Sequence, residues 1–189
     1  MACVAAVWCQ AGTASTAESW HTLRAQSGAI ALSVPATWID FTQLTPQLID
    51  RAKSIPALRV YIEAARNSKA IKLLAADIGP ATVKSGFANN ANLIQTPTVG
   101  NLALIRAAAV AQLKATGIVR GPIRTGYTTL PSGRALTLRY VLQVGGKLVA
   151  TSQFVLIRGG VSTALTYSFR PGALSEATIQ RSARSLELG

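Results

Sequence analysis

Apolar and polar residues alternate with a period of two toward the C-terminal end of the chain. The alternation runs through residues 118–130, 134–144, 147–158 and 161–169, which is typical of β-strands with two different faces. In the second run, one face carries Leu136, Leu138, Tyr140, Leu142 and Val144, and the other carries Thr137, Arg139 and Gln143. The strings PSG, GG and GG join the runs, and they are short enough to force antiparallel hairpins. The pattern therefore predicts a four-stranded meander.

Two other segments repeat apolar residues at helical spacing. In residues 101–117, Gly117 is placed as a C-cap, and the apolar stripe consists of Leu102, Ile105, Ala109 and Leu113. The segment 174–188 begins with Ser175 as an N-cap and Glu176 in the first turn, and its apolar face consists of Ile179, Ala183 and Leu186. Leu174 and Ile179 occupy the hydrophobic-staple positions around this cap. Both segments are predicted to be amphipathic helices.

The first part of the chain predicts one strand and two helices. The segment 28–38 is predicted to contain the strand, which ends at Pro35, and Trp38 is expected to anchor the core. Thr45 is the N-cap of a helix to about residue 54. Apolar residues at helical spacing predict a second helix over residues 56–67.

Residues 70–79 and 91–98 predict two further strands, separated by a polar, glycine-containing loop. The complete order predicts an α+β fold in which an antiparallel sheet of about six to seven strands lies between N-terminal or middle helices and a C-terminal helix. A chain of 189 residues with 49% hydrophobic residues is long enough for one well-packed domain. We assign that domain to residues 21–189.

The charge of the chain is unbalanced. Lysine and arginine number 19 against 7 aspartate and glutamate residues, which gives a net charge of +12. No acidic residue lies between Asp77 and Glu176, where there are ten basic residues. Such a field attracts polyanions, anionic headgroups or acidic proteins. The alternative is that arginine serves here only as the solubilising charge.

Residues 1–20 predict a leader or a disordered N-terminus. A short apolar run is followed by small residues, which resembles the end of a secretory signal without its basic region. The run is too short for a transmembrane helix, and Cys9 follows Trp8 where a lipidation signal needs a small residue. A terminus without any role is the competing interpretation.

The residues that carry most enzyme chemistry are scarce. Catalysis by a serine or cysteine nucleophile would need His21, which we expect in a flexible segment at the edge of the leader. The only soft metal ligands are Cys3, Cys9 and His21, so we predict no metal site. The carboxylates Asp40, Asp50, Glu63 and Asp77 are scattered, and Asp50 and Glu63 are expected to pair with Arg51, Arg59 and Arg66. The strings GPIRTG and RGG are interpreted as turns. The sequence thus predicts a protein without catalytic residues or cofactor.

Five strings follow one another in a set order: SVPATW, FANNANLI, TGYTTLPSGRALTLRYVL, SQFVLIRGGVSTALTYSF and IQRSARSLEL, over about residues 30–188. In this order they resemble the PsbP-like α/β/α sandwich and, within it, the actinobacterial LpqN/LpqT-type envelope lipoproteins. The resemblance implies a mostly non-catalytic fold, because PsbP is an extrinsic subunit of a photosynthetic complex and a eukaryotic relative binds the small GTPase Ran. It implies no catalytic residue in this chain.

We therefore expect a non-catalytic binding or accessory protein of the cell envelope that engages a protein or an anionic envelope component. The residues assigned to contact are the outward basic ones of the meander: Arg124, Arg134, Arg139, Lys147 and Arg158. The alternative is an intracellular protein that binds nucleic acid or an acidic regulatory protein. The low aromatic content, 6%, argues against nucleic acid, since sequence-tolerant binders stack bases on exposed aromatic rings.

Overall fold

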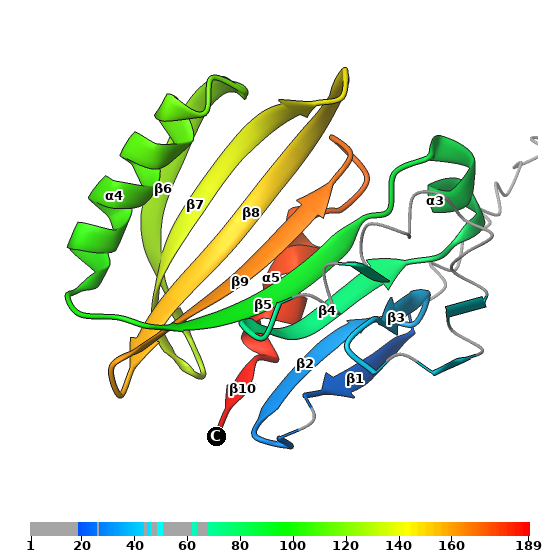
Figure 1. The fold of residues 1–189 in the computed structure, drawn as a ribbon, viewed down its shortest axis with the longest axis horizontal. Helices are drawn as coiled ribbons and strands as arrows, with labels where there is room; N and C mark the ends of the chain where they lie inside the picture. Colours follow the sequence, from blue (N-terminus) through cyan, green and yellow to red (C-terminus); the bar gives the residue numbers. More distant parts are fainter. Residues whose placement is uncertain (1–18, 26, 44, 47–48, 51–61, 64–67) are drawn as a thin grey trace, which may run out of the picture.

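The computed structural model describes residues 19–25, 27–43, 45–46, 49–50, 62–63 and 68–189 (Figure 1). The main feature of the fold is one large seven-stranded sheet, whose strand order is β3-β4-β5-β9-β8-β7-β6. All neighbouring strands are antiparallel. The strands are β3 Trp38–Asp40, β4 Ile71–Asp77, β5 Asn90–Pro97, β6 Val119–Leu130, β7 Gly133–Val144, β8 Lys147–Arg158 and β9 Val161–Phe169.

The predicted meander is confirmed by β6 to β9. Gly145 and Gly146 join β7 to β8 with φ values of 54° and 76°, and Gly159 and Gly160 join β8 to β9 with 55° and 73°. Two successive positive φ angles give a two-residue turn whose twist matches the twist of the strands that it joins. The hairpin register therefore follows directly from the two glycine pairs.

A smaller sheet of three strands, in the order β1-β2-β10, lies beside the large one. Its strands are β1 Trp20–Arg24, β2 Ile30–Pro35 and β10 Glu187–Leu188. The strand predicted over residues 28–38 ends at Pro35 as expected. The chain then turns, and Trp38, which is 3% exposed, begins a strand of the large sheet.

Helices cover the large sheet on both faces, which confirms the predicted α+β sandwich (Figure 1). Helix α4, Leu102–Ala115, packs its predicted stripe against Leu136, Leu138 and Val155 on one face. Helix α5, Glu176–Arg184, lies on the other face, where Ile179 and Ala183 join the main core. Asn101 caps α4 and Ser175 caps α5 through side-chain oxygens that accept backbone N–H groups.

Side-chain hydroxyl groups connect three layers of the fold: the large sheet, α5 and the small sheet. The Tyr167 hydroxyl on the large sheet donates to Ser182 Oγ on α5 at 2.8 Å. Ser182 Oγ in turn donates to the Ser33 carbonyl on β2 at 2.6 Å, and the Ser33 N–H donates to Ser185 Oγ at 2.8 Å. The chain of hydrogen bonds satisfies polar groups that burial would otherwise leave without partners.

Three expectations about local structure are wrong. The segment after β4 is not only loop, because Pro80–Ser85 forms the short helix α3. The C-terminal helix ends at Arg184, and Glu187–Leu188 becomes β10 because it pairs with β2. His21 is not in a flexible segment, because it lies in β1 opposite Val34 of β2.

The two helices predicted over residues 45–54 and 56–67 lie mainly outside the described residues. Residues 46, 49, 50, 62 and 63 are helical. Ile62 packs in a second cluster of buried residues with Phe41, Leu74, Ala76 and Ala88. Among the described helices, none is long and apolar enough to cross a membrane.

Candidate functional site

The best candidate for a site is a pocket on the face of the large sheet that α5 covers. Its volume is about 360 Å³. The pocket lies between the start of α5 and the adjoining parts of β6, β7 and β8. It is lined by Arg120, Pro122, Arg124, residues 139–141, residues 150–152, Phe169, Leu174, Glu176 and Ile179.

Three arginines converge on this pocket because of an irregularity in the edge strand β6. Arg124 is paired directly with Arg139 of β7, and Arg120 is paired with Val141. Between these two pairs, three residues of β6, 121–123, therefore oppose one residue of β7, Tyr140, which makes a bulge around Gly121 and Pro122. Gly121 has a φ of 76°, which glycine adopts without strain, and an edge strand tolerates proline. Since Arg139 and Val141 share a face, Arg120 and Arg124 are brought to that same face.

The three guanidinium groups differ in their partners. Arg139 pairs with Glu176 at the first turn of α5, and Gln180 also donates to that carboxylate at 2.8 Å. Arg120 Nε donates to Gln143 Oε1 at 2.7 Å, and one of its terminal nitrogens donates to the Gly117 carbonyl at 3.2 Å. For Arg124, the described residues supply no hydrogen bond and no salt bridge. Arg124 is therefore the guanidinium with the most donors left for a ligand.

The charges of this cluster do not balance. Three arginines face one carboxylate, and like charges placed directly opposite each other on adjacent strands destabilise a sheet by about 0.2–1 kcal/mol. The pairing of Arg124 with Arg139 is such a case. Both side chains are exposed, which keeps the cost in stability small. Sheet stability alone nevertheless does not favour this pairing.

The rest of the pocket wall is largely apolar. Phe169 is 8% exposed and Ile179 is 2% exposed, and both belong to the main core. Ala150 and Leu174 are partly buried and pack against that core. The pocket therefore has a cationic rim and a wall held in place by the core.

This composition suits binding better than acid–base or nucleophilic chemistry. Arginine stays protonated throughout the physiological pH range, so it cannot act as a general base. The described lining residues include no histidine, cysteine or lysine, and their one carboxylate, Glu176, is paired with Arg139. What the site offers is charge-assisted donors in the planar geometry that carboxylates and phosphates accept.

Arg134 and Lys147, which we assigned to contact from the sequence, lie outside this pocket. The Arg134 guanidinium lies 4.5 Å from the centre of the Tyr127 ring, and the strand alternation places it on the α4 face. Lys147 Nζ donates to the Gly86 carbonyl at 3.2 Å, just beyond the end of α3. Both side chains therefore have structural partners.

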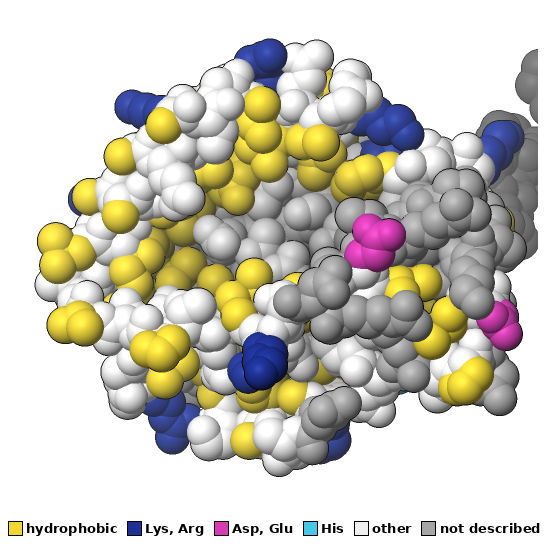
Figure 2. Space-filling model, viewed as in Figure 1, with side chains coloured by type: hydrophobic (Ala, Val, Ile, Leu, Met, Phe, Trp, Pro, Cys, Tyr) yellow, Lys and Arg dark blue, Asp and Glu magenta, His cyan; other side chains and the backbone are white. Residues whose placement is uncertain are grey.

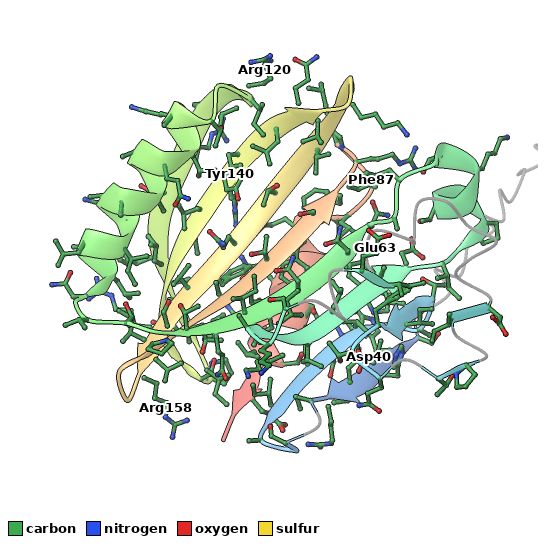
Figure 3. All side chains as sticks on the ribbon, in the orientation of Figure 1. Asp40, Glu63, Phe87, Arg120, Tyr140 and Arg158 are labelled. Atoms are coloured by element: carbon green, nitrogen blue, oxygen red, sulfur yellow. The ribbon has the colours of Figure 1, made fainter. Side chains whose placement is uncertain are left out.

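Arg158 is also separate from the pocket. It donates to the Leu188 carbonyl of β10 at 2.6 Å. Figure 3 shows Arg158 and Arg120 at opposite ends of the large sheet. Of the five residues assigned from the sequence, the fold thus brings together Arg124 and Arg139.

Two residues of the pocket, Arg120 and Glu176, were missed as site residues. The string GPIRTG contained a signal, because glycine followed by proline inside an alternating run indicates a bulge. We interpreted that string as a turn, which is wrong, since residues 121–126 lie within β6. For Glu176 the sequence carried no signal, because its contact with Arg139 joins elements 37 positions apart.

The acidic candidates are dispersed and serve local structure. Asp77 accepts from the Gly79 N–H at 2.9 Å and from the Thr82 hydroxyl at 2.6 Å, which ties it to α3. Asp40 accepts from the Thr42 N–H at 2.7 Å, and burial raises the pKa of its carboxyl above the usual range although the Thr42 hydrogen bonds oppose this. Figure 3 shows Asp40 and Glu63 far from Arg120. Among the described residues, no three histidine, cysteine or acidic side chains form a metal-binding group, and Cys3 and Cys9 lie outside them.

The opposite face of the sheet has a different character. Figure 2 shows apolar side chains lining a hollow beside α4, with lysine and arginine side chains scattered over this face. Large apolar side chains are exposed here, among them Leu104 of α4 and Val144 of β7. Among the described residues of this face, Figure 2 shows lysine and arginine side chains apart from one another, unlike the three arginines of the pocket.

No protein-family model matches the chain, and no curated protein matches it. Solved structures do share its fold. The cyanobacterial PsbP protein CyanoP from Synechocystis sp. PCC 6803 aligns with a TM-score of 0.56 and 11% identity, over 94% of this chain and 96% of CyanoP. The Ran-binding protein Mog1p of Saccharomyces cerevisiae aligns with a TM-score of 0.52 and 12% identity, over 91% of this chain and 86% of Mog1p.

A protein from Bacteroides thetaiotaomicron aligns with a TM-score of 0.50 and 9% identity over 89% of this chain. The chain spans about half the length of that protein, 48%. The similarity to these structures shows that the chain has the PsbP-like fold that the sequence resemblance implied.

Proposed function

We propose that the protein is a non-catalytic binding protein that engages an anionic partner through Arg120, Arg124 and Arg139. The observation that carries the proposal is the direct cross-strand pairing of Arg124 with Arg139. Such a pairing costs stability, so a function that needs both charges in one place accounts for it. The yeast protein Mog1p, which binds Ran, supports a binding role for this fold.

The competing explanation, that the arginines only keep the protein soluble, accounts less well for the pocket. Solubility requires exposed charges spread over the surface, as Arg134 and Arg158 are. It does not require a bulge that brings Arg120 to the same pocket as the other two arginines. Nor does it require the Arg124 guanidinium to be without a hydrogen-bond or salt-bridge partner among the described residues. The grouping, rather than the net charge, distinguishes the two explanations.

Titration of the full chain with citrate and with tripolyphosphate, followed by two-dimensional amide NMR, tests the proposal. We expect shifts concentrated at residues 120, 124 and 139, with affinity falling as salt rises. Arg124→Gln and Arg139→Gln each lose about tenfold or more in affinity, since each removes hydrogen bonds to a charged group. Arg134→Gln is the matched control, because it removes the same charge from the opposite face. Equal losses in Arg134→Gln and Arg124→Gln would defeat the proposal.

We also propose that the protein works in the cell envelope, as the resemblance to LpqN/LpqT-type lipoproteins suggested. The support is the leader-like composition of residues 1–20. N-terminal sequencing and intact mass of the native protein from fractionated cells test this. An unprocessed chain in the cytosol would contradict it, and would direct the search to acidic cytosolic partners.

A further inference from the structure

We infer that the pocket binds a small amphipathic anion, with a carboxylate or phosphate head at the arginines and an aliphatic body against the apolar wall. This inference rests on the proposed function and specifies its ligand. A partner that used the basic residues as a flat charged patch would need no cavity. Here the three arginines line an open pocket of about 360 Å³, and this volume is within the range of roughly 300–1,000 Å³ that small-molecule sites occupy.

The wall of the pocket is suited to an alkyl chain. The side chains of Val141, Ala150, Phe169, Leu174 and Ile179 present apolar atoms to it. Phe169 and Ile179 are core residues, so their positions are set by packing and do not have to be ordered when a ligand binds. A preformed apolar wall with a few charged donors at one end is the usual composition of a site for such ligands.

Glu176 shows how the head of the ligand is held. Its carboxylate already pairs with Arg139 at the edge of the pocket, so it occupies a position that a ligand carboxylate would take. The pair is exposed, with side-chain exposures of 44% for Arg139 and 51% for Glu176, and exposed pairs of this kind contribute little stability. If Glu176 swings away, it stays at the first turn of α5, where a negative charge is favoured.

Glu176 therefore acts as an internal competitor for the ligand. Glu176→Gln removes the competing charge while Gln180 and the Ser175 cap remain. We expect this variant to bind anionic ligands about twofold to fivefold more tightly, which is the value of a surface ion pair expressed as an affinity ratio.

A homologous series separates the amphipathic ligand from a simple anion. The full chain is titrated by calorimetry or amide NMR with acetate, butyrate, hexanoate and octanoate below their micelle concentrations, and with octyl phosphate and octanol. Each added methylene that enters the pocket is expected to raise affinity by about fourfold. Octanol, which lacks the charged head, binds much more weakly than octanoate, and comparison of octanoate with octyl phosphate identifies the preferred head.

Ala150→Leu is the variant that tests the wall. It fills the apolar part of the pocket and leaves all three arginines in place, so the dependence on chain length flattens while citrate binding persists. Thermal unfolding checks that the variant is folded. Leu148→Ala on β8 serves as the control, because Leu148 is exposed and does not line the pocket.

The outcomes are distinct. Affinity that rises with chain length, depends on Arg124 and flattens in Ala150→Leu supports the inference. Acetate and octanoate binding with equal affinity, both dependent on Arg124, overturns the inference and leaves the proposed function intact. Chain-length dependence that survives Arg124→Gln and Arg139→Gln overturns the inference too, because the alkyl chain would then bind elsewhere. Absence of citrate and tripolyphosphate binding at the arginines is the separate result that defeats the proposed function.

Discussion

Replacing Ser182 should destabilise the fold more than its size suggests, because its hydroxyl connects three layers. Tyr167 is 2% exposed, and its hydroxyl donates to Ser182 Oγ. In Ser182→Ala the phenol keeps its buried position and loses its acceptor, which costs about 1–3 kcal/mol. The Ser33 carbonyl also loses its donor, for about 1 kcal/mol more. We expect a total loss of about 2–4 kcal/mol in the free energy of unfolding.

Tyr167→Phe is the informative comparison. It removes the phenol oxygen together with its need for a partner, and Ser182 continues to donate to Ser33. Its cost should be only about 0.5–1.5 kcal/mol, the net value of one hydrogen bond. In the double variant no phenol is left unsatisfied. Its loss of unfolding free energy should therefore be about 1–2 kcal/mol smaller than the sum of the losses in the two single variants.

Urea unfolding monitored by circular dichroism gives these free energies, provided that the m-value is unchanged among the variants. Ser19→Ala is the control, since Ser19 is exposed and a surface substitution of this kind changes stability little. The reasoning would be refuted if Ser182→Ala cost no more than Tyr167→Phe, or if the two substitutions were additive.

Three further predictions concern charge and packing. Arg124→Thr should raise the free energy of unfolding by about 0.2–1 kcal/mol, because it removes the like charge opposite Arg139, while it weakens citrate binding; a loss of stability in urea would contradict this. Burial raises the pKa of Asp40, so its neutral form favours folding at low pH, and that contribution is lost as pH rises through the folded-state pKa. The free energy of unfolding of Asp40→Asn, relative to that of the unsubstituted protein, should therefore increase as pH rises from the unfolded-state pKa of Asp40 to its folded-state pKa. A difference that stays constant from pH 3 to pH 7 would contradict the raised pKa of Asp40. Leu138→Ala should cost about 2–5 kcal/mol in thermal or urea unfolding, because Leu138 is fully buried under α4; a cost below 1 kcal/mol would show that the space beside α4 closes readily.

Local patterns in the sequence were sufficient to predict the strands β6 to β9 and the helix α4. A strand with one buried face repeats with a period of two, and two consecutive glycines determine both the turn and the register. The capping residues Asn101 and Ser175 act within three positions of themselves, so their effect can also be recognised along the chain. In these elements the signal and the structure that it produces are close together in sequence.

The elements that were predicted wrongly depend on partners distant in sequence. Glu187–Leu188 continues a helical pattern, but pairing with Ala31 and Ile30 of β2 makes it a strand, because tertiary pairing outweighs local propensity. His21 becomes ordered for the same reason, since β1 is stabilised by its ladder with β2.

The site shows the same division. The sequence by itself determined that the middle of the chain is cationic and that Arg139 points away from the apolar face of its strand. It did not determine which basic residues meet. Only the tertiary structure placed Arg120, Arg124 and Arg139 around one pocket and separated Arg134, Lys147 and Arg158 from it. The physical reason is that the net charge of a segment is a sum over its residues and does not depend on their positions in space. This binding site, in contrast, forms only where the β6 bulge, the paired strand β7 and the start of the distant helix α5 come together.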